Sequence, residues 1–108
     1  MSKRGKVFVS DIFAGIIKED ESGFTFTYDQ EYLRSDGATP VSLALPLQEK
    51  PYASNVMFSF FDGLIPEGWL LEIGERNWKI DRRDRMQLLL LFCRDCIGAV
   101  SVIQENEK

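Results

Sequence analysis

Cys93 and Cys96 are the residues whose type and spacing come nearest to a chemical site. A C-x-x-C pair serves dithiol redox centres and supplies ligands to many zinc sites. A redox thiolate is normally stabilised at a helix N-terminus, whereas this pair follows the predicted C-terminal end of a helix and flanks Asp95. Zinc needs two further ligands, and the sequence has neither a third cysteine nor a histidine. We therefore expect a buried Cys93 and a Cys96 in a loop.

Carboxylates near apolar segments are the next candidates, because a pair of them can act as general acid and base. Their spacing selects no pair, and surface charge and helix capping account for them. The absence of histidine excludes Ser-His-Asp and Cys-His sites in this chain alone. Phosphate-binding and kinase catalytic motifs are also missing. We predict a protein that is not an enzyme and uses no cofactor or metal. The carboxylates concerned are Asp62, Glu67, Glu72, Glu75 and Asp95.

Two tryptophans are candidates for binding rather than catalysis. Trp69 follows Pro66, Glu67 and Gly68 in the first turn of a predicted helix, beside a glycine that leaves room for an outward side chain. Tryptophan is enriched among the residues that dominate protein interfaces. For Trp78 we favour a core or half-covered position. For Trp69 a covered and a partner-facing position both stay open.

Length and charge define the broad class. The chain has 108 residues with 44% hydrophobic and 28% charged side chains, which predicts one globular domain, 1–108. Its net charge of −4 gives no general attraction to nucleic acid, and its basic clusters are short. No secretion signal opens the chain, and no apolar run is long enough to cross a bilayer. We expect a cytoplasmic protein without direct contact to nucleic acid or membrane.

Several short strands are predicted from the sequence pattern. Apolar and polar residues alternate in short runs, with turn residues at 11–15 and 19–23. Within the third run, Phe24, Phe26 and Tyr28 should face the core. The predicted strands are 6–10, 15–18, 24–28, 41–45 and 98–103.

The run at 41–45 leads to a separate prediction. Val41, Leu43 and Leu45 alternate with small residues, so a strand would place all three on one face. Pro46 would end that strand because it lacks an N–H.

Helices are expected mainly in the second half. The last has Met86, Leu89, Leu90 and Cys93 on one face, and its wider apolar surface predicts a helix sandwiched between the sheet and another surface. Strands, then helices, then a strand indicate an α+β fold: a small, mostly antiparallel sheet or barrel-like unit with about three helices. The predicted helices are 30–33, one capped by Ser54 or Asn55 and ended by Gly63, one from Pro66 to about 77, and 82–93 capped by Asp81.

Three segments resemble the N-terminal subdomain of HipA-type serine/threonine kinases, the toxins of bacterial toxin–antitoxin modules. They are VSLALPLQ at 41–48, FFDGLIPEG at 60–68 and CIGAVSVI at 96–103. The resemblance extends over nearly the whole chain, from Val7 to Ile103. It implies a small β-rich unit with helices that packs on a kinase core without supplying ATP-binding or catalytic residues.

A HipA protein would continue into its kinase core where this chain stops, and the polar ending at 104–108 is expected to be a natural terminus. The chain therefore looks most like the small HipS proteins of tripartite HipBST systems. That resemblance implies an antitoxin that neutralises a HipT-like serine/threonine kinase, with a HipB-like helix-turn-helix protein as the DNA-binding partner. A non-inhibitory structural subunit that completes a split kinase stays open as the alternative. The expected contact residues are Asp62, Ile65, Pro66, Glu67, Gly68 and Trp69.

Overall fold

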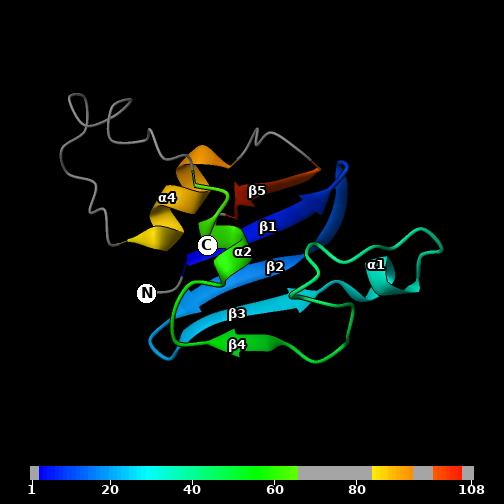
Figure 1. Ribbon diagram of the computed structural model, residues 1–108, viewed down its shortest axis with the longest axis horizontal. Coiled ribbons are helices and arrows are strands. Elements are labelled where there is room, and N and C mark those ends of the chain that lie inside the picture. Colours follow the sequence, from blue (N-terminus) through cyan, green and yellow to red (C-terminus); the bar gives the residue numbers. More distant parts are fainter. Residues whose placement is uncertain (1–2, 66–83, 94–98, 106–108) are drawn as a thin grey trace.

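An open antiparallel sheet forms the centre of the computed structural model, which describes residues 3–65, 84–93 and 99–105 (Figure 1). The sheet order is β4-β3-β2-β1-β5, so the first and last strands of the chain are neighbours. This confirms the predicted α+β class with an antiparallel sheet. The strands are β1 (Lys3–Val9), β2 (Ile12–Asp20), β3 (Gly23–Tyr28), β4 (Tyr52–Ser54) and β5 (Val100–Gln104).

Three helices accompany the sheet within the described ranges. They are α1 (Gln30–Arg34), α2 (Ser59–Asp62) and α4 (Arg85–Phe92). The last two lie together over one face of the sheet, whereas α1 extends beyond the end of β3 (Figure 1). The helix predicted from Pro66 to about 77, and Trp78 after it, fall outside the described residues.

The first hairpin has a tighter turn than the sequence predicted. Ser10 and Asp11 both have positive φ angles, 50° and 69°, which makes a two-residue connection with the twist that a hairpin favours. Asp tolerates this left-handed conformation better than most residues. Residues 12–14, predicted as part of the turn, therefore belong to β2.

The core forms where the strands turn their apolar side chains toward α2 and α4. Val7, Ile17, Phe26 and Val102 have no exposed surface. In β3, Phe26 and Tyr28 are buried as predicted and Phe24 is half-buried. This face of the sheet therefore supplies one wall of a single hydrophobic core.

The helix α4 supplies the opposite wall. Its buried residues include the predicted stripe, and it packs close enough to β1 that a Cβ on Gly5 would lie 2.8 Å from Leu90 Cδ2. Glycine at that position therefore permits the contact. The helix begins later than predicted: its N-cap is Asp84, not Asp81, and Asp84 Oδ1 accepts a hydrogen bond from the Gln87 N–H at 3.1 Å. The buried stripe consists of Met86, Leu89, Leu90 and Cys93.

The helix α2 is shorter than its sequence suggested. Ser54 and Asn55 do not cap it, because Ser54 ends β4, whose backbone pairs with β3, and the N-cap is Phe58. Gly63 ends the helix as predicted. None of the helices in 3–65 and 84–93 is long and apolar enough to cross a bilayer.

Candidate functional site

The predicted contact segment starts at the C-terminal end of α2, and two of its residues are described. The Asp62 carboxylate forms an ion pair with Arg85 of α4, with 2.6 Å between Oδ1 and Nε. Ile65 is buried in the core. These two contacts fix the position from which the segment departs, and the Ile65 side chain itself faces the core. Pro66, Glu67, Gly68 and Trp69 lie outside the described residues.

A second feature, which was not predicted from the sequence, is a loop at 39–46 held by tyrosine hydroxyls, which we call the clamped loop. The chain has three tyrosines, and each donates its hydroxyl to a backbone carbonyl of this loop. Tyr28 of β3 donates to Leu45 O, and Tyr32 of α1 donates to Thr39 O at 2.6 Å.

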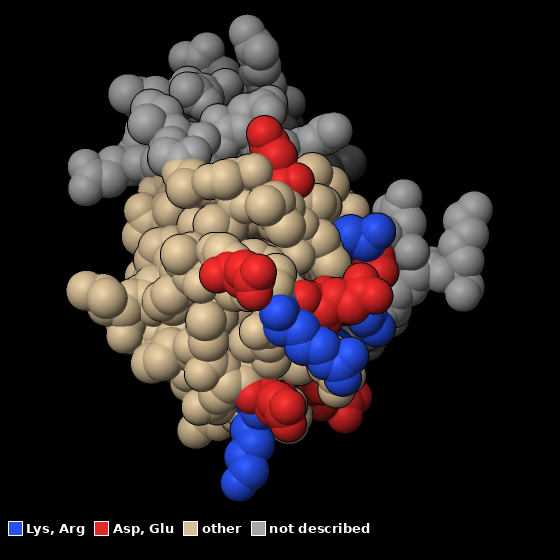
Figure 2. Space-filling model, turned by 90° about the vertical axis from the view of Figure 1, so that its right-hand side faces the viewer, with Lys and Arg blue, Asp and Glu red and all other residues tan. Residues whose placement is uncertain are grey.

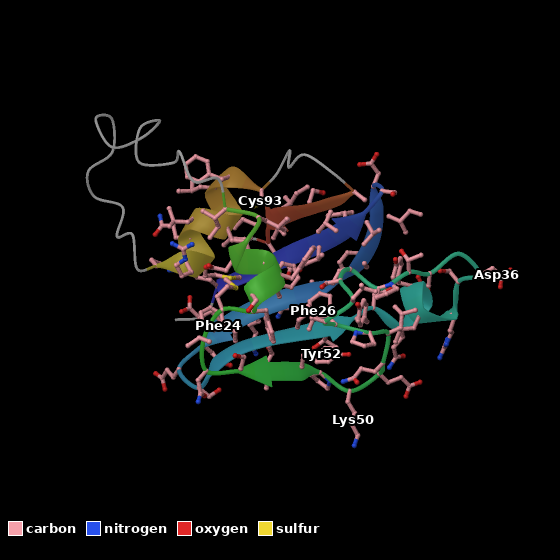
Figure 3. The ribbon with its side chains drawn as sticks, in the orientation of Figure 1. Phe24, Phe26, Asp36, Lys50, Tyr52 and Cys93 are labelled. Atoms are coloured by element: carbon pink, nitrogen blue, oxygen red, sulfur yellow. The ribbon has the colours of Figure 1, made fainter. Side chains whose placement is uncertain are left out.

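The third bond comes from β4. Tyr52, which pairs with Phe26 across strands β3 and β4, donates to Pro46 O at 2.5 Å (Figure 3). Two of the hydroxyls also accept hydrogen bonds from the loop: Val41 N–H donates to Tyr28 at 3.0 Å, and Thr39 N–H donates to Tyr32 at 3.1 Å. The loop is thus fastened to β3, β4 and α1.

The tip of the clamped loop is a turn rather than the predicted strand. Leu45 N–H donates to Ser42 O at 3.0 Å, and Ala44 N–H donates to Ser42 Oγ at 3.1 Å. The prediction of one shared face for its apolar residues is wrong, because Val41 and Leu45 are buried whereas Leu43 is 95% exposed. The turn reverses the chain between the two buried residues and leaves Leu43 outside.

The clamped loop itself contains no charged residue. Residues 38–48 contain no Asp, Glu, Lys or Arg. Glu49 directly follows this run, and the nearby Asp36 and Lys50 point away from the body of the molecule (Figure 3). Viewed from the side where α1 and the loop lie in Figure 1, the molecule has an uncharged area toward the left, and charged side chains lie near the centre and toward the right and lower margins (Figure 2).

Burial controls the ionisation of the central tyrosine. Removal of Tyr28 from water raises the pKa of its hydroxyl above the usual value, and the nearby Tyr52 and Tyr32 act in the same direction against the opposing effect of the Val41 N–H. The hydroxyl is therefore neutral at ordinary pH and keeps the proton that it donates to Leu45 O.

Comparison with known proteins agrees with this fold. A model of the HipA N-terminal domain matches residues 5–103. The chain belongs to the HipA N-terminal domain family. A solved structure described as the N-terminal domain of HipA toxin has a TM-score of 0.75 and 33% identity, covering 98% of this chain and 95% of that chain. A Haemophilus influenzae protein without an assigned role is 34% identical over 105 residues, 97% of this chain and 95% of its own length.

Membership in the HipA N-terminal domain family agrees with the chemistry of the remaining candidates. Cys93 is buried at the C-cap of α4, as predicted, and its Sγ donates to Leu64 O at 3.4 Å. Cys96 lies outside the described residues. Among the residues that the structure describes, no three metal-ligating side chains gather in one place.

Sequence patterns alone did not reveal the clamped loop. Its one usable signal is compositional: three tyrosines flank an uncharged run that contains Leu43. Tyrosine predicts a buried ring with a hydroxyl that needs a partner. Which backbone groups provide that partner depends on the tertiary fold.

Proposed function

We propose that this chain is an antitoxin of the HipS type, a cytoplasmic binding module that docks on a HipT-like serine/threonine kinase and neutralises it. The observation that carries the proposal is the family match, which extends over residues 5–103 of a 108-residue chain. The solved relative is described as the N-terminal domain of a HipA toxin, which is one part of such a toxin. Such a part is well suited to bind the remainder.

The proposed contact is the segment that follows α2. Asp62 and Ile65 hold the start of this segment against α4 and the core. Pro66, Glu67, Gly68 and Trp69 would then reach the kinase, with Trp69 as the anchor. A rigid starting point lowers the entropy cost of docking such a segment.

A DNA-binding protein of the HipB type would complete the assembly. The net charge of −4 on this chain gives no attraction to DNA phosphates. Contact with DNA in the complex therefore falls to the helix-turn-helix partner.

The alternative is a non-inhibitory subunit that completes a split HipA-like kinase. The solved relative favours it to some extent, because its name describes the domain as the N-terminal part of a toxin. The two functions predict effects of opposite sign on kinase activity, so a kinase assay separates them.

The test of the proposal is rescue of bacteria from the HipA-type kinase of the source organism. Co-expression of the wild-type chain should restore growth, and the chain should copurify with the kinase. Trp69→Ala should reduce both effects, whereas Val56→Ala, at an exposed site between β4 and α2, should preserve them. Full rescue by Trp69→Ala with unchanged affinity would remove Trp69 from the interface. Failure of the wild-type chain to copurify would overturn the proposal.

A further inference from the structure

We infer that the clamped loop is a second docking element, whose Leu43 side chain inserts into an apolar pocket on the partner kinase. This inference rests on the proposed function and adds to it a contact that lies apart in the sequence from the segment after α2.

The exposure of Leu43 is the first observation. At 95%, it is the most exposed of the large hydrophobic side chains in the described ranges. Its immediate neighbours in the alternating pattern, Val41 and Leu45, are buried. Buried residues on both sides of the turn thus hold Leu43 in water, where its side chain adds little to the stability of the folded domain.

The hydrogen bonds of the loop are the second observation. The hydroxyls of Tyr28, Tyr32 and Tyr52 each hold a loop carbonyl, and the turn adds two bonds of its own to Ser42. Ordering a flexible loop on binding costs affinity, and a loop that is already ordered avoids that cost. The clamp therefore presents Leu43 in a fixed place, as a docking residue requires.

The chemistry of the surroundings identifies the kind of partner surface. Residues 38–48 are uncharged up to Glu49, so an apolar, uncharged surface is the best match for Leu43 at the tip of the loop. A membrane is a poor fit, since membrane-surface binding relies on a larger apolar face and on basic residues facing anionic lipid. A protein pocket that accepts one leucine fits the geometry.

A second copy of this chain is a poorer partner than the kinase. The groove between β1, β5 and α4 has a volume of about 150 Å³. Leu43 of one copy in the groove of another would join two different surfaces, and such contacts continue into open chains unless they close into a ring. The net charge of −4 on each copy also opposes self-association. Lys3, Gln87, Leu90, Leu91 and Gln104 line the groove.

The test measures the affinity of the full chain for the purified kinase by titration calorimetry. Leu43→Ala should weaken binding about tenfold, because it removes most of the apolar surface that the pocket buries. Leu43→Asp should weaken it further, since it places an unpaired carboxylate in that pocket. Tyr52→Phe should produce a smaller loss, because it keeps the Leu43 side chain but removes one of the hydrogen bonds that order the loop.

The control is Val56→Ala, which shortens an apolar side chain that is 69% exposed and lies outside the clamped loop. Its affinity should match that of the wild type. Circular dichroism confirms that each variant is folded. If the wild type binds and Leu43→Asp binds equally well, the inference is overturned while the proposed function stands. If the wild type does not bind the kinase, both are overturned. Concentration-dependent self-association that Leu43→Asp abolishes would assign the loop to a second copy instead.

Discussion

The sheet–α4 core and the clamped loop place the same kind of side chain in opposite environments. Leu89 of α4 has no exposed surface, whereas Leu43 of the loop is 95% exposed. Burial of apolar area stabilises the core, and hydrogen bonds from tyrosine side chains to the backbone stabilise the loop. An alternating pattern alone therefore does not decide burial: the turn of the clamped loop buries Val41 and Leu45 and leaves Leu43 in water.

Truncation of the two leucines should give the sharpest contrast. Leu89→Ala is expected to lower the free energy of unfolding by about 2–5 kcal/mol, because it removes buried atoms and leaves a cavity. Leu43→Ala should change it by less than about 0.5 kcal/mol. Urea denaturation measures both. Leu91→Ala, on the same helix but 47% exposed, is the control and should cost clearly less than Leu89→Ala. Equal losses at Leu43 and Leu89 would contradict the contrast.

Removal of one tyrosine hydroxyl should weaken the clamp. Tyr28→Phe leaves Leu45 O and the buried Val41 N–H without their partner, so the free energy of unfolding should fall by about 1–3 kcal/mol. Tyr52→Phe is the matched substitution and should cost less, because Tyr52 is only half-buried and water can replace its hydroxyl. If Tyr28→Phe left the free energy of unfolding unchanged, the hydrogen bonds of the Tyr28 hydroxyl would make no net contribution to stability.

Alkaline pH should weaken the clamp without any substitution. Because the folded-state pKa of Tyr28 is raised, its contribution to stability is fully present below the unfolded pKa of about 10 and is lost as pH rises through the folded value. The melting temperature should therefore fall as the pH rises above about 10. Tyr28→Phe should show a shallower decline than the wild type, and an identical decline would assign the effect to other groups.

The ion pair at the start of the contact segment should have the smallest effect on stability. Its side chains are 43% exposed at Asp62 and 34% exposed at Arg85, so Asp62→Asn should cost at most about 1 kcal/mol. Moderate salt should reduce the difference between wild type and variant, since ions screen exposed pairs. A loss of several kcal/mol would mean that the pair holds α2 against α4 far more strongly than its exposure allows.

The sequence predicted the parts of the fold that depend on local patterns. The alternation in β3, the final strand and the apolar face of α4 were all found, because each element follows one period and packs on one side. The missing strand β4 is a three-residue segment after a proline, too short to have a period. The position of Leu43 depends on hydroxyls from three other elements, a long-range arrangement that no local pattern contains.

The sequence likewise predicted one part of the candidate site and missed another. Family motifs in the sequence directed attention to the segment from Asp62 to Trp69, and the structure describes where its beginning is anchored. The clamped loop overlaps another of those motifs, at 41–48, but the exposure of Leu43 follows from the turn, which the motif does not reveal. Both regions lie in or next to sequence motifs of the family, whereas the local geometry of each region depends on how its side chains pack.

The most direct test of the account is the phosphorylation activity of the HipA-type kinase of the source organism, measured as increasing amounts of this chain are added. Kinase activity should fall to a low plateau near one equivalent of the chain, and Trp69→Ala and Leu43→Asp should shift the midpoint to higher concentration. An activity that rises with the added chain would favour the structural subunit, and an activity that does not change would contradict both docking functions.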